Sequence, residues 1–171
     1  MSRALLYRIF GLMLLISIGQ SALGQGIRNY AHHPIYIYNF CRFTQWPDVK
    51  TEITIGVLGN SPLYQGLQRM AATKSTYNLK FIIKKYNTPA EITGCDVLFV
   101  PYASNFDIKQ VYQKIAGRNV MLITEDEKVK DVTCFNFVVM EGKLMYQVNK
   151  QQCEKSKLKV SQKLLSLGIL I

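Results

Sequence analysis

The sequence predicts a single compact α/β domain, with a largely parallel sheet flanked by helices and with a C-terminal β-hairpin and helix. Three short, nearly continuous apolar runs, at residues 53–58, 96–100 and 119–123, are typical of strands buried on both faces. Amphipathic segments separate these runs, and such β-α alternation predicts a parallel sheet with helices on both faces. Further along the chain, two strand-like segments flank Glu141-Gly142, which indicates a hairpin.

Residues 1–24 are predicted to be a secretory signal peptide that is cleaved at its end. Arg3 and Arg8 supply a positive start, an apolar run follows at 9–19, and small residues precede the cleavage point. An uncleaved membrane anchor is the alternative, but the apolar run is shorter than the roughly 20 residues that a spanning helix needs. We therefore expect the mature chain, residues 25–171, to be exported to the periplasm.

Residues 25–33 are expected to form a flexible, exposed leader, because they combine Gly, Asn and both His residues without an apolar period. The next segment has the aromatic and β-branched composition of a strand, whereas Tyr36, Phe40 and Phe43 follow the spacing of one helix face. We predict a helix over about residues 34–45, which ends before the next proline because the residue preceding proline disfavours helical conformation.

The strand at 53–58 is expected to lead directly into a helix. It ends at Gly59-Asn60, and Ser61-Pro62 then supplies an N-cap residue and a proline suited to the first helical turn. The apolar face of this helix is marked by Leu63, Leu67 and Met70. A second strand is predicted at 79–84.

The middle of the chain continues the same alternation. Residues 87–92 leave room for a short turn of helix before the strand at 96–100. A helix is predicted at 105–116 and a fourth strand at 119–123, and the apolar face of that helix carries Ile108, Val111, Tyr112 and Ile115.

The last part of the chain changes from parallel to antiparallel pairing. Segments 134–140 and 144–149 are the two strands of the predicted hairpin. A short helix is expected at 150–155 and an amphipathic one at 160–167. Because no repeat or low-complexity linker interrupts the chain, we predict one domain over residues 34–171.

The charge balance favours an acidic or anionic neighbour. The chain has 21 Lys+Arg against 11 Asp+Glu, a formal charge of +10, and loss of residues 1–24 would leave 19 basic residues and a charge of +8. Such a surface suits nucleic acid, anionic lipid or an acidic protein. Export and the scattered placement of the lysines argue against nucleic acid.

The residues do not predict an enzyme, a metal site or a cofactor. Both histidines lie in the expected leader, so no general base is available for a Ser or Cys nucleophile in the folded body. Glu125-Asp126-Glu127 follows a strand, where sites of α/β proteins often lie. We interpret these three acids as a solvated loop, since they lack the glycine and the terminal glutamate of a calcium-binding loop.

Four cysteines in an exported chain suggest disulfides, although buried thiols are the alternative. Four cysteines permit three pairings. The hairpin favours Cys134–Cys153, because Cys134 falls opposite residues near the start of the following helix. The remaining pair, Cys41–Cys95, follows by elimination.

Two further sets of residues are candidates for binding. Gly59, Asn60 and Ser61 join a strand to a helix start, where backbone N–H groups can hold an anion, although a plain turn has the same sequence. Trp46, with Tyr38 and Arg42 on the first helix, could anchor a partner, because Trp is enriched at interface hot spots. A core position for Trp46 at the rim of the sheet is the alternative.

Six short motifs, taken in their order, resemble the YfiR-like periplasmic proteins over residues 34–171. They are Tyr38-Asn39-Phe40-Cys41-Arg42-Phe43-Thr44-Gln45-Trp46-Pro47, Ile53-Thr54-Ile55-Gly56-Val57-Leu58-Gly59, Gly94-Cys95-Asp96-Val97-Leu98-Phe99-Val100, Asn136-Phe137 with Glu141-Gly142, Asn149, and Ser161-Gln162-Lys163-Leu164-Leu165. Cys95 fits the Gly-Cys position of that family. Cys41 departs from it, because small or apolar residues are usual there.

The resemblance implies an α/β domain, often dimeric, that acts as a regulator and not as an enzyme. It implies a repressor that acts on the periplasmic sensor domain of a membrane diguanylate cyclase, or of another signalling protein such as a sensor kinase. It also implies an outer-membrane lipoprotein as a possible second partner. The alternative hypothesis is a small-ligand receptor of periplasmic-binding type, which would use Gly59, Asn60 and Ser61 together with the loop 125–127.

Overall fold

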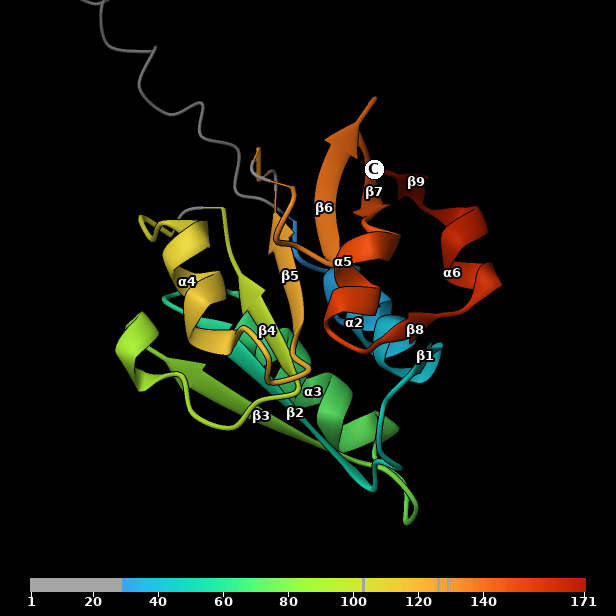
Figure 1. Ribbon diagram of the computed structural model, residues 1–171. Coiled ribbons are helices and arrows are strands. Elements are labelled where there is room, and N and C mark those ends of the chain that lie inside the picture. Colours follow the sequence, from blue (N-terminus) through green and yellow to red (C-terminus); the bar gives the residue numbers. More distant parts are fainter. Residues whose placement is uncertain (1–28, 103, 126, 129) are drawn as a thin grey trace, which may run out of the picture.

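The computed structural model describes residues 29–102, 104–125, 127–128 and 130–171. Its main feature is a seven-stranded sheet in the order β3-β2-β4-β5-β6-β7-β9 (Figure 1). The strands are β2 (Glu52–Leu58), β3 (Lys80–Tyr86), β4 (Val97–Val100), β5 (Met121–Glu125), β6 (Phe135–Met140), β7 (Lys143–Val148) and β9 (Ile169–Leu170). The helical elements are α2 (His33–Arg42), α3 (Leu63–Lys74), η1 (Pro89–Glu91), α4 (Ile108–Ile115), α5 (Lys150–Lys155) and α6 (Gln162–Leu167).

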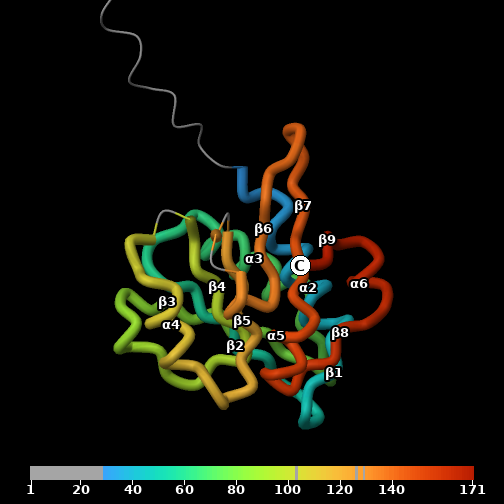
Figure 2. The backbone as a smooth tube through the Cα atoms, turned by 45° about the horizontal axis from the view of Figure 1, so that its top comes forward, coloured from blue at the N-terminus to red at the C-terminus, as the bar shows by residue number. Residues whose placement is uncertain are grey.

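The pairing of the strands confirms the predicted fold class. Strands β3, β2, β4, β5 and β6 are parallel neighbours, and β6 and β7 form the antiparallel hairpin. The hairpin turn has positive φ at both central residues, 51° at Glu141 and 74° at Gly142, as a two-residue turn between twisted strands requires. Figure 2 shows the hairpin extending beyond the other strands.

Each face of the sheet has its own hydrophobic core, because successive side chains of a strand point to opposite faces. On β4, Val97 and Phe99 face the core beneath α2 and α3, and Leu98 and Val100 face the core beneath α4. The larger core also receives side chains from α5 and α6. This two-sided burial explains why the central strands are apolar throughout.

The helix starts follow the expected capping chemistry. The Asp107 side chain accepts a hydrogen bond from Lys109 N at the start of α4, and Ser161 accepts one from Leu164 N at the start of α6. At α3, Pro62 takes the N-cap position predicted for Ser61, and the Ser61 hydroxyl accepts from Leu63 N at 3.2 Å. Each bond satisfies a backbone donor that the helix itself leaves free.

The first helix differs from the prediction in its bounds and in its buried face. It ends at Arg42, because Thr44 and Gln45 form a short strand, β1 (Thr44–Gln45), that pairs with β8 (Lys159–Val160). Phe43 lies after the helix and is exposed. The buried face consists of His33, Ile37, Phe40 and Cys41.

The predicted leader is wrong at its C-terminal end. Tyr30 is half-buried, and His33, the first residue of α2, is buried. Contacts with residues far along the chain hold these side chains, as described below. The predicted signal peptide, residues 1–24, lies outside the described residues. In the part that the structure describes, no helix is long and apolar enough to span a membrane.

Candidate functional site

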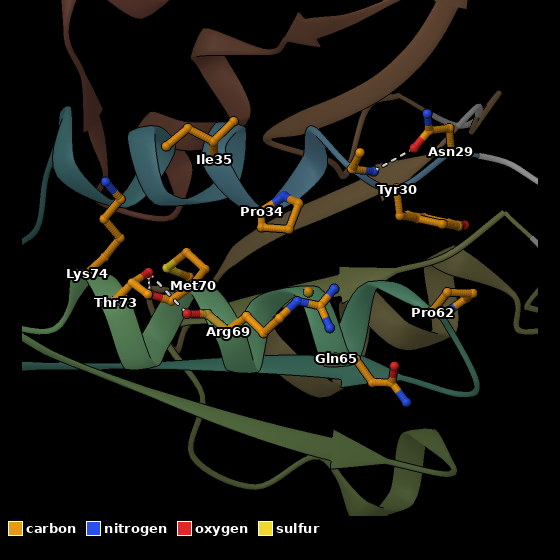
Figure 3. A pocket seen from close by; sticks show the side chains of 12 residues that line it. Asn29, Tyr30, Pro34, Ile35, Pro62, Gln65, Arg69, Met70, Thr73 and Lys74 are labelled. Atoms are coloured by element: carbon orange, nitrogen blue, oxygen red, sulfur yellow. Dashed lines mark hydrogen bonds between the residues drawn. The ribbon is translucent and has the colours of Figure 1, made fainter.

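A groove lies between α2 and α3. Its volume is about 720 Å³. Figure 3 shows Pro34 and Ile35 on the α2 side, with Gln65, Arg69, Met70 and Thr73 on the α3 side. The remaining lining residues are Asn29, Tyr30, Ala31, Pro62, Gly66 and Lys74.

A glycine in the middle of α3 permits the close approach of the two helices beneath this groove. A Cβ atom added to Gly66 would lie 3.0 Å from Pro34 Cγ, which is tighter than ordinary van der Waals contact. Leu63 and Leu67 are turned into the core, whereas Met70 is buried and also borders the groove. Gly66 therefore allows the two helices to touch and also lines the groove between them.

The charged side chains that line the groove are both basic. Arg69 and Lys74 line it, and no acidic residue is among its lining residues. Both side chains are exposed. The Lys74 ammonium lies 5.6 Å from the centre of the Tyr38 ring, within reach of a cation–π interaction. The groove thus combines an apolar surface with an uncompensated positive edge.

A polar cluster around Glu125 holds the end of the groove that Tyr30 lines. The Tyr30 hydroxyl donates to Glu125 Oε2 at 2.8 Å, and His33 Nε2 lies 3.4 Å from Glu125 Oε1. The Tyr102 amide also donates to Glu125 Oε2, at 3.2 Å. Because Tyr30 lines the groove, this cluster connects the groove wall to the end of β5.

The environment of Glu125 stabilises its charged form. Burial by itself would raise the pKa of Glu125, but the close contact with His33 and the hydrogen bonds from Tyr30 and the Tyr102 amide outweigh it and hold the pKa below its ordinary value. Hydrogen bonding to a carboxylate has this effect because it favours the ionised state. The cluster therefore depends on an ionised carboxylate.

Two predictions about these residues are wrong. We expected Glu125 in a solvated loop, whereas it is the last residue of β5 and only 3% exposed. We also expected both histidines outside the folded body, whereas the His33 ring lies between Tyr30 and Phe137, with ring centroids 4.8 and 4.6 Å away. The reason is that α2 packs on the same face of the sheet as Phe137.

The three predicted partner-binding residues lie in the second half of α2 and just beyond its end. Tyr38 packs on Phe81 and beneath Lys74. Arg42 and Trp46 line a separate hollow of about 430 Å³ beyond the end of α2. Trp46 is half-buried against the core, and its indole N–H donates to Cys41 O at 3.2 Å. Trp46 thus has a structural role, and its contact with a partner stays a prediction.

The predicted anion site at Gly59, Asn60 and Ser61 is a β-to-α turn that is hydrogen-bonded within the chain. Gly59 N donates to Tyr86 O at 2.7 Å. Asn60 Oδ1 lies 3.4 Å from Lys85 Nζ, and the Ser61 hydroxyl accepts from Leu63 N. Ligand binding at this turn stays a prediction.

Sequence reasoning missed Arg69 and Gly66 and misplaced His33 and Glu125. The signal for the groove was present in part, because the segment 63–74 contains two basic residues, no acid and a mid-helix glycine. No local signal predicts the contact between His33 and Glu125, which are far apart in the sequence.

The cysteines are thiols in the structure, and the predicted pair Cys41–Cys95 is wrong. Cys41 belongs to the core beneath α2, and Cys95 packs against the core beneath α4, so the sheet lies between them. Burial raises the pKa of Cys95 to about 11, which leaves it unreactive at neutral pH.

Cys134 and Cys153 are neighbours, as predicted, although they are not bonded in the structure. Cys153 Sγ lies 3.8 Å from Cys134 O, and both residues are fully buried. The hydrogen bond with the Cys134 thiol, followed by burial, raises the pKa of Cys153. A disulfide between these two residues stays a prediction.

We expect the protein to contain two free thiols, at Cys41 and Cys95, after denaturation without reducing agent. Closing the loop between Cys134 and Cys153 would stabilise the domain by about 3 kcal/mol in the loop-entropy treatment. Thiol counting measures the number, and peptide mapping assigns the pair. Four free thiols would exclude the disulfide.

A comparison with curated proteins gave no match. The sequence profile of the YfiR/HmsC-like family, in contrast, matches residues 30–169. The match includes both helices of the groove and the Glu125 cluster. This protein belongs to the YfiR/HmsC-like family.

Proposed function

We propose that this protein is an exported periplasmic regulator that represses a membrane diguanylate cyclase through the periplasmic sensor domain of that enzyme. The family match over residues 30–169 carries the proposal, because proteins of this family are periplasmic regulators of cyclic-di-GMP signalling. A sensor kinase is the other membrane signalling protein that such a regulator could address.

The arrangement of the described residues supports a binding role over a catalytic one. The histidine and carboxylate that could act as a base are buried together and are used to attach the N-terminal segment to β5. The groove beside them is large, open to partners and basic, as a surface for protein contacts would be. An exported chain with this surface can reach the outer part of a membrane receptor.

An outer-membrane lipoprotein that sequesters the regulator, and a homodimeric state, belong to the same proposal. Both would control how much free regulator reaches the cyclase. Neither requires a cofactor or a nucleic acid.

Deleting the gene in its own bacterium is expected to raise cyclic-di-GMP, because the cyclase would lose its repressor. The full-length chain should restore the low level. A chain that lacks residues 2–24 should not, because it would remain in the cytoplasm, on the wrong side of the membrane. Mass-spectrometric quantification of cyclic-di-GMP measures the effect, with immunoblots to match protein levels.

Two results would contradict the proposal. An unchanged level after deletion would exclude repression of a cyclase. Restoration by the chain that lacks residues 2–24 would exclude action from the periplasm.

A further inference from the structure

We propose that the groove between α2 and α3 binds an acidic, amphipathic helix from the periplasmic domain of the membrane partner. This inference rests on the proposed function and specifies the chemistry of its partner. Three properties of the groove carry it: the shape between two helices, the apolar floor and the charge of the edge.

The shape suits a third helix. The groove runs between two adjacent helices, as Figure 3 shows, and its volume of about 720 Å³ can hold several side chains. A groove of this kind takes one face of an amphipathic helix, whose side chains at positions i, i+3, i+4 and i+7 enter it. The Tyr30 hydrogen bond to Glu125 fixes the wall at one end, so the groove is preformed there.

The floor of the groove supplies apolar contact. Pro34 and Ile35 of α2 line it on one side, and Pro62, which precedes α3, and Met70 of α3 line it on the other. Ile35 is 41% exposed although it is a large aliphatic residue. Burial of such surface in a complex is favourable in proportion to its area. Leu or Phe side chains of a partner helix would bury this apolar surface.

The basic edge of the groove favours a partner that has acidic side chains. Arg69 and Lys74 lie on the α3 side, and none of the ion pairs found among the described residues includes either of them. Complementary charge steers a partner and fixes its orientation. The Arg69 guanidinium can bind a carboxylate through two parallel hydrogen bonds.

A second copy of this chain does not match that chemistry. Helices α2, α3, α4 and α6 contain no acidic residue, and α5 contains only Glu154. No described helix of this protein therefore offers both an apolar face and an acidic flank. A different protein therefore matches the groove better than a second copy does.

Charge reversal at Arg69 tests the proposal. In the deletion strain, Arg69→Glu is expected to leave cyclic-di-GMP at the level of the strain without the protein, because repulsion replaces attraction at the partner's carboxylates. The matched control is Lys114→Glu, an exposed residue on α4, on the other face of the sheet; it should repress like the unaltered chain. Both substitutions are at exposed positions, and equal thermal unfolding midpoints would verify that folding is unchanged.

The outcomes separate this inference from the proposed function. If the unaltered chain fails to repress, the proposed function fails. If the unaltered chain represses and Arg69→Glu represses equally well, the function stands and the groove inference is overturned.

A suppressor selection identifies the occupant. Restored repression by Arg69→Glu is expected from changes of Asp or Glu to Lys or Arg in the periplasmic domain of one membrane protein. Two results would overturn the acidic helix: Arg69-dependent binding of the purified protein to vesicles of phosphatidylglycerol and phosphatidylethanolamine without such suppressors, or an oligomeric state that changes with Arg69→Glu.

Discussion

Replacing Phe40 with alanine is expected to lower the free energy of unfolding by about 3–5 kcal/mol, the usual cost of removing a buried aromatic side chain. Phe40 is fully buried and stacks on Phe135 at 4.0 Å between ring centroids, with an angle of 8° between the planes. Tyr146 meets the Phe40 ring edge-on at 4.9 Å. The substitution would leave a cavity where α2 meets the hairpin strands.

Urea denaturation monitored by circular dichroism measures this loss. The matched control is Phe43→Ala, one turn further along the chain, where the ring is 36% exposed. The Lys163 ammonium lies 4.6 Å from the centre of that ring, and we expect a smaller cost than at Phe40, about 1 kcal/mol, because the side chain is only partly buried and its removal leaves no closed cavity. Equal losses for the two variants would show that α2 is not anchored through Phe40.

Replacing Glu125 with glutamine is expected to lower the free energy of unfolding by about 1–3 kcal/mol at neutral pH, because buried donors lose a charged acceptor. The Tyr30 hydroxyl and the Tyr102 amide both donate to this carboxylate, and His33 contacts it. Since Tyr30 lines the groove, the variant should also repress less well, through displacement of the groove wall.

The effect of Glu125 has a defined pH dependence. The pKa of this carboxyl is lower in the folded state than its ordinary value, which is about 4.3 in an unfolded chain. The ionised group therefore stabilises the fold fully above that value, and this contribution is lost as the pH falls through the lower, folded-state pKa. The difference between the unaltered chain and Glu125→Gln should therefore stay constant at neutral pH and shrink once the pH falls below about 4.3.

The control for this measurement is Glu52→Gln, because Glu52 is an exposed residue at the start of β2. It removes one negative charge at the start of a strand and should change stability by less than about 0.5 kcal/mol. A difference for Glu125→Gln that stays constant with pH would show that the charge of Glu125 does not stabilise the fold.

The periodicity of the sequence determined the secondary structure and the fold class. Continuous apolar runs can be satisfied only where both faces of a strand are covered, so β2, β4 and β5 could be recognised without coordinates. The hairpin turn at Glu141 and Gly142 and the caps at Asp107 and Ser161 depend on local backbone chemistry. Local signals of this kind are contained in a few adjacent residues.

Tertiary packing alone decided the site. His33 and Glu125 meet because α2 packs across the sheet next to the end of β5, and no local pattern encodes that contact. The same holds for Cys41 and Cys95, which elimination paired although the sheet lies between them. The groove exists because Gly66 lets α3 approach Pro34, so its apolar floor and basic edge form only when the two helices are packed together.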